Sequence, residues 1–86
     1  MAIIYLLDNI DSFTYNLVDE FAQLGYETRL YRNTVPADYI FQQMCAETSP
    51  VLLVLSPGPG SPANAGSMPA LLLLCEAKFP VLGICL

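Results

Sequence analysis

The chain has 86 residues, of which 55% are hydrophobic and 13% are charged, and its formal net charge is −5. That length permits one small domain. The apolar content excludes a disordered chain and favours a buried parallel sheet. The acidic balance argues against nucleic acid or an anionic membrane as a partner, and no apolar run is long enough to span a membrane.

Strands are predicted at four places along the chain: residues 3–7, 27–31, 51–55 and 81–84. All but residues 27–31 are apolar runs. The run at 27–31 alternates only weakly, which favours a position nearer the edge of the sheet. The run at 51–55 has the strongest strand character.

A first helix is predicted between the first two strands. Asp11 or Ser12 can cap its start, and Gly25 is typical of the residue that ends a helix. Four side chains recur every three or four residues and predict its buried face: Phe13, Leu17, Phe21 and Leu24.

Two further helices are predicted from their first-turn residues. Pro36 suits the start of one, and Asp38 suits the positive end of its dipole. Ser67 can cap the other, with Pro69 tolerated in the first turn. The second helix should bury three side chains: Ile40, Phe41 and Met44.

The order β-α-β-α-β-α-β with short connections predicts parallel strands and helices on both faces of the sheet. We predict an α/β fold with a flavodoxin-like, doubly wound sheet of strand order 2-1-3-4, truncated after the fourth strand. Ligands bind beyond the carboxyl ends of the strands in such sheets. Three polar or reactive segments should lie there: residues 8–12, residues 56–60 and Cys85.

The cysteines are odd in number and form no Cys-x-x-Cys pair, so neither a disulfide framework nor a metal site is expected. We expect no cofactor and a reducing, cytoplasmic setting. Cys85 directly follows a strand, where many α/β enzymes expose a nucleophile, although most free cysteines are only small buried apolar residues. That second interpretation is the one we adopt for Cys45 and Cys75, which lie within helical patterns.

The segment Ser56-Pro57-Gly58-Pro59-Gly60 follows the third strand. It lacks the spacing of a phosphate-binding or dinucleotide-binding glycine loop. It could be only a rigid exit from the strand. Beside a cysteine at a strand end, its backbone amides also suit an oxyanion hole.

Together, residues 8–17, residues 56–60 and the Gly83-Ile84-Cys85-Leu86 end resemble the amino-terminal half of a class I, triad-type glutamine amidotransferase. The resemblance covers nearly the whole chain, so residues 1–86 would be the N-terminal part of one such domain. Within the family, the motifs around Asn33, Gly58 and Gly66 are most similar to anthranilate synthase component II, and the related component of aminodeoxychorismate synthase is the close alternative.

The resemblance implies a mechanism and a partner. Cys85 would attack the carboxamide of glutamine, Gly58 and Leu86 would hold the oxyanion through their N–H groups, and Pro59 and Gly60 would complete the substrate loop. Ammonia would pass to anthranilate synthase component I, the chorismate-binding subunit. The family's histidine and glutamate lie beyond this chain, which contains no histidine. The 86 residues alone are therefore expected to be inactive. A non-catalytic α/β module that binds a partner through the same edge is the other alternative.

Overall fold

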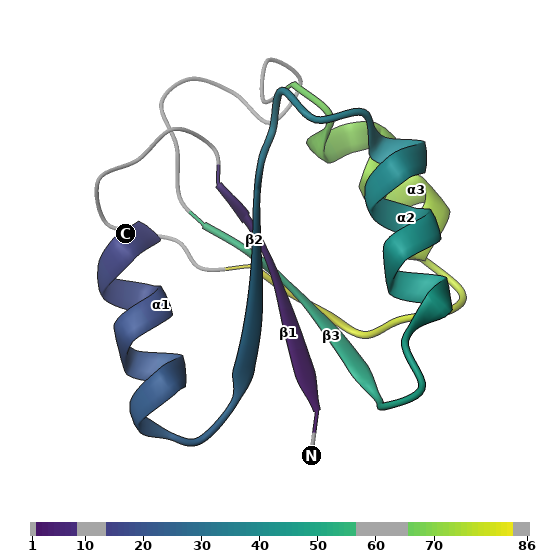
Figure 1. Cartoon of the computed structure of the whole chain (residues 1–86). Coiled ribbons are helices and arrows are strands. Elements are labelled where there is room, and N and C mark those ends of the chain that lie inside the picture. Colours follow the sequence, from purple (N-terminus) through teal and green to yellow (C-terminus); the bar gives the residue numbers. More distant parts are fainter. Residues whose placement is uncertain (1, 9–13, 57–65, 84–86) are drawn as a thin grey trace.

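The structure is a computed structural model that describes residues 2–8, 14–56 and 66–83 of the chain. The elements alternate along the chain (Figure 1): β1 (Ile3–Asp8), α1 (Thr14–Gln23), β2 (Glu27–Arg32), α2 (Ala37–Ala46), β3 (Val51–Leu55), α3 (Met68–Cys75) and β4 (Val81–Gly83). None of the described helices is long and apolar enough to cross a membrane.

The four strands form one parallel sheet in the order β2-β1-β3-β4, which confirms the predicted flavodoxin-like order. β1 lies between β2 and β3, and all six of its residues are buried. β2 lies at one edge, as its weak alternation indicated, and β4 lies at the other edge of the described sheet. A continuous apolar run thus occupies the centre because both faces of a doubly wound sheet are covered.

Each face of the sheet carries its own core. Figure 1 shows α1 on one side of the sheet and α2 with α3 on the other. Because side chains alternate along a strand, Ile4 and Leu6 of β1 pack with Leu17 of α1. Tyr5 and Leu7 join the larger core under α2 and α3. Ile40 and Met44 are buried in that core, and Phe41 packs against it, as the helical spacing predicted.

The end of α1 confirms the role of Gly25 and corrects that of Leu24. Gly25 has a φ of 88° and donates its N–H to Ala22 O at 3.0 Å, while Tyr26 donates to Phe21 O at 3.0 Å. These two hydrogen bonds form the motif in which a glycine with a positive φ ends a helix. Leu24 is 67% exposed, because it lies in the turn between α1 and β2, past the end of the helix. The proposed caps at Asp11 and Ser12, and Phe13, lie outside the described residues.

The starts of α2 and α3 differ in detail from the sequence prediction. Pro36 is the residue before α2, and Asp38 lies in its first turn as expected. Pro69 does lie in the first turn of α3, but Ser67 makes no capping hydrogen bond with its side chain. Its φ of −78° and ψ of −5° are helical, whereas a capping serine needs an extended backbone.

Candidate active site

The carboxyl ends of the described strands lie level with one another at one edge of the sheet. Asp8, the last residue of β1, is in register with Arg32, the last residue of β2. One residue earlier on β1, Leu7 is in register with Leu55, which in turn is in register with Gly83. The chain segments that follow these strands therefore leave from a single edge, at the upper end of the strands in Figure 1.

The structure describes the strands that precede the predicted site residues, but not those residues themselves. Five residues lie outside the described part of the chain: Cys85, Gly58, Pro59, Gly60 and Leu86. The structure places Ser56, two residues before Gly58, and Gly83, two residues before Cys85, at the same edge. Contact between Gly58 and Cys85 remains a prediction.

Three buried polar side chains mark this edge. Asp8, Asn33 and Ser56 are each at most 6% exposed, and each follows or ends a different strand. All three make polar interactions, as buried polar groups require. Sequence analysis placed Asp8 and Ser56 at this edge but named Asn33 only in a motif of the family resemblance, not as a residue of this edge. The signal that could have identified it is a polar residue directly after a strand.

Hydrogen bonds tie these residues to the end of β1. Ser56 donates both its N–H and its hydroxyl to Leu7 O, at 3.1 and 3.0 Å. The N–H of Asn33 donates to Asp8 O at 2.9 Å, and Ser67 donates its N–H to Asn33 O at 2.8 Å. The polar edge is therefore a connected backbone network with the end of β1 at its centre.

The thiols of the two described cysteines are in very different surroundings. Cys75 is fully buried in the core and donates a weak hydrogen bond to Met44 Sδ at 3.8 Å. Burial, with a smaller effect of nearby Cys45, raises its pKa from 9.0 to about 11, so it stays a neutral thiol at physiological pH. Cys45 is exposed, which corrects the expectation that both are buried apolar residues. A buried neutral thiol is not a nucleophile, so Cys75 is a structural residue.

We predict that the raised pKa of Cys75 makes the fold less stable at high pH. The folded pKa lies above the unfolded one, so this stabilisation is complete below pH about 9 and is lost as the pH rises through about 11. The difference of two pKa units corresponds to a loss of at most about 3 kcal/mol in the free energy of unfolding. The measurement is urea unfolding of the full-length protein at pH values from 8 to 11. As the pH rises, the free energy of unfolding should fall less in Cys75→Ala than in the wild type.

Cys45→Ala is the matched control, and its stability should fall with pH as that of the wild type does. The pKa values of Tyr5 and Tyr31 are also raised, by burial first, and they account for a remaining fall above pH about 10. An identical pH dependence in Cys75→Ala and the wild type would contradict the assignment.

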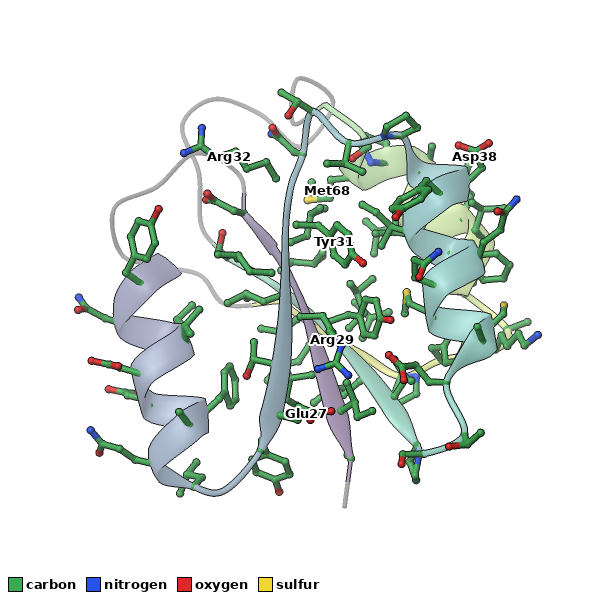
Figure 2. The ribbon with its side chains drawn as sticks, viewed as in Figure 1. Glu27, Arg29, Tyr31, Arg32, Asp38 and Met68 are labelled. Atoms are coloured by element: carbon green, nitrogen blue, oxygen red, sulfur yellow. The ribbon has the colours of Figure 1, made fainter. Side chains whose placement is uncertain are left out.

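A second polar group lies away from this edge, between β2 and α2. Tyr5 donates its hydroxyl to Glu47 Oε2 at 2.6 Å, and Arg29 contacts Glu27 at 2.8 Å and Glu47 at 3.7 Å. Figure 2 shows Glu27, Arg29 and Tyr31 along the same strand, with Arg29 and Tyr31 on the side of α2. The ring of Tyr31 stacks on that of Tyr5 at 5.8 Å. We interpret this group as structural, because its partners satisfy one another.

Comparison with known proteins agrees with this fold. The chain matches the family model described as glutamine amidotransferase class-I over residues 5–86. It therefore belongs to the class-I glutamine amidotransferase family, whose fold is consistent with the parallel, flavodoxin-like sheet.

The names of the similar curated proteins are more specific than the family description. The chain is 54% identical over 86 residues to anthranilate synthase component 2 of Vibrio parahaemolyticus, covering all of this chain and 43% of that protein. It is 45% identical over 83 residues to the protein of the same name from Helicobacter pylori strain 26695, covering 96% of this chain and 43% of that protein. It is 53% identical over 83 residues to the pyocyanine-specific anthranilate synthase component 2 of Pseudomonas aeruginosa, covering 96% of this chain and 41% of that protein. The chain thus spans less than half the length of these relatives.

Proposed function

We propose that the full-length protein is the glutamine amidotransferase component of an anthranilate synthase. It hydrolyses glutamine and delivers the ammonia to a chorismate-binding subunit, which is anthranilate synthase component I. The observation that carries this proposal is the identity of 54% along the whole chain to a protein named anthranilate synthase component 2. A thiol nucleophile works in a reducing compartment, and we expect that compartment to be the cytoplasm.

In the proposed reaction, the Cys85 thiolate attacks the side-chain carbonyl carbon of glutamine. The oxyanion of the tetrahedral intermediate accepts hydrogen bonds from the N–H groups of Gly58 and Leu86, beside Pro59 and Gly60. The intermediate collapses to a thioester as the C–N bond breaks, and the amide nitrogen leaves with an added proton as ammonia. Water then cleaves the thioester to release glutamate and restore the thiol.

The described residues support this assignment in two ways. The strands that lead to Gly58 and Cys85 end at one edge, where ligands bind in doubly wound sheets. The raised pKa of Cys75 removes one competing thiol. The histidine base must come from the part of the full-length protein outside these 86 residues, because the chain has no histidine. The family resemblance implies the same origin for the glutamate that orients it.

The proposal can be tested by alkylation with a glutamine analogue, followed by mass spectrometry of each cysteine. In the full-length protein we expect the reagent to label Cys85 ahead of Cys45 and Cys75, and glutamine to protect Cys85. Exposed Cys45 reports ordinary thiol reactivity, and buried Cys75 should stay unlabelled.

A polypeptide of residues 1–86 alone should show Cys85 labelled no faster than Cys45, because the base is missing. Equal, glutamine-protected labelling of Cys85 in both polypeptides would contradict the mechanism. If the full-length protein shows no glutamine-protected labelling at all, the result would favour the alternative interpretation, a non-catalytic partner-binding module. Product analysis with chorismate separates anthranilate from aminodeoxychorismate, the alternative pathway.

A further inference from the structure

Arg32 is an exposed cation without an ionic partner in the described part of the chain. The whole chain has only three basic residues against eight acidic ones. Arg29 forms ion pairs with two glutamates, at 2.8 and 3.7 Å. Lys78 lies over the rings of Phe41 and Phe79, at 5.8 and 6.0 Å from their centres. Of the three cations, Arg32 is therefore the one whose charge the described residues leave unpaired.

The side chain of Arg32 lies at the carboxyl edge of the sheet, on the side of α1. Arg32 is the last residue of β2, and Figure 2 shows it at the upper end of that strand. Its neighbour Tyr31 packs against the core under α2 and α3. Because successive side chains of a strand point to opposite faces, Arg32 belongs to the face that α1 covers.

Tyr15 is an exposed aromatic residue at the same corner of the molecule. α1 contacts β2, and a short turn leads from the end of this helix to the start of that strand. The helix therefore runs antiparallel to β2, and its first turn, which contains Tyr15, lies at the carboxyl edge (Figure 1). The Tyr15 side chain is 66% exposed. Tyrosine and arginine are two of the residue types that most often dominate the binding energy of protein interfaces.

The proposed reaction releases ammonia at this edge of the sheet. Gly83 ends β4 there, in register with Leu55. Cys85 follows Gly83 by two residues, so their Cα atoms lie within about 7 Å of one another along any path of the chain. A subunit that receives the ammonia must cover this edge, because water would otherwise take up the product of the reaction.

A partner seated over the end of β4 is wide enough to reach Arg32. The strand order is β2-β1-β3-β4, and neighbouring strands are about 4.8 Å apart, so β2 lies about 14 Å from β4. A standard interface covers about 800 Å² on each partner, which is a disc of about 16 Å radius. The corner with Arg32 and Tyr15 therefore falls inside the rim of such an interface.

We propose that Arg32 and Tyr15 form part of the surface that docks the chorismate-binding subunit, and that this subunit presents an acidic group to Arg32. This inference rests on the proposed function, which requires that subunit. In a chain of net charge −5, an unpaired cation at the docking edge attracts an acidic group and speeds association. Tyr15 adds a large apolar contact that loses little conformational entropy.

The charge is tested by Arg32→Glu in the full-length protein, with the Kd for the chorismate-binding subunit measured by surface plasmon resonance. At about 0.15 M salt we expect the Kd to rise about 10-fold, mainly through slower association. At about 1 M salt the difference from the wild type should shrink to about twofold, because salt screens charges beyond about 3 Å. Lys78→Glu is the matched control, since it makes the same change of charge in the turn before β4, at the amino edge. Its Kd should stay within about twofold of the wild type.

The aromatic contact is tested by Tyr15→Ala in the same assay. We expect the Kd to rise about 10-fold through faster dissociation, and to the same extent at both salt concentrations, because the contact is apolar. Tyr26→Ala is the matched control. Tyr26 is 37% exposed and lies just before β2, at the amino edge, so its removal should leave the Kd within about twofold.

The outcomes separate the docking surface from the proposed function. If the wild type does not bind the chorismate-binding subunit, the proposed function is wrong and the docking surface falls with it. If the wild type binds, but Arg32→Glu or Tyr15→Ala matches its control, only the docking surface is wrong. If the full-length protein alone forms a dimer that Arg32→Glu dissociates, the surface binds a second copy, and the assignment to the chorismate-binding subunit is overturned.

Discussion

Replacing Cys85 by serine in the full-length protein should abolish glutamine-dependent synthesis and leave ammonium-dependent synthesis intact. The serine hydroxyl is a much weaker nucleophile than a thiolate at neutral pH, so the thioester cannot form. We expect the glutamine-dependent rate to fall by about a thousandfold or more. Under the proposed function, the chorismate-binding subunit should still take ammonia from solution, because its own site is unchanged. Both rates can be measured on the same preparation.

Cys45→Ser is the matched control for this experiment. It makes the same chemical change at an exposed thiol on α2, and both rates should stay at the wild-type level. A parallel loss of the glutamine- and ammonium-dependent rates in Cys85→Ser would indicate a failure of folding or assembly. A glutamine-dependent rate unaffected by Cys85→Ser would refute the nucleophile assignment.

A polypeptide of residues 1–86 alone should self-associate strongly through β4. This strand is three residues long and pairs with β3 alone among the described strands. Val81 is 38% exposed and Leu82 is 47% exposed. Beside them lies an apolar hollow of about 770 Å³ between α3 and β4, with Leu72, Leu73 and Phe79 in its lining. An open strand edge next to exposed apolar side chains is a template for pairing with another chain.

Analytical ultracentrifugation can test this with two variants of equal charge. Leu82→Lys places a charge on β4, and it should shift the population from large oligomers toward monomer. Leu24→Lys makes the same change at the end of α1, where the side chain is 67% exposed but remote from β4. That variant should associate as the wild type does. A monodisperse wild-type monomer with a sharp thermal transition would contradict the prediction.

Local sequence patterns determined the elements, their order in the sheet and much of the core. The buried run of β1, the spacing of Ile40 and Met44, and the glycine at position 25 each carry a signal within a few residues. Short connections between strands and helices then leave few topologies available. The carboxyl edge of the sheet, where ligands bind, follows from that order. For these features, the local preference and the final packing agree.

The tertiary structure decided the features that depend on contacts between distant parts of the chain. Cys45 and Cys75 have similar helical surroundings in the sequence, but only Cys75 faces the sheet. Ser67 is of a residue type that often caps helices, yet its N–H donates to Asn33 O and its backbone is helical. Neighbours in sequence could not show that the carbonyl of Asn33 occupies the space beside Gly66. Local preference is worth about 1 kcal/mol, so a buried hydrogen bond or a steric contact from another strand can override it.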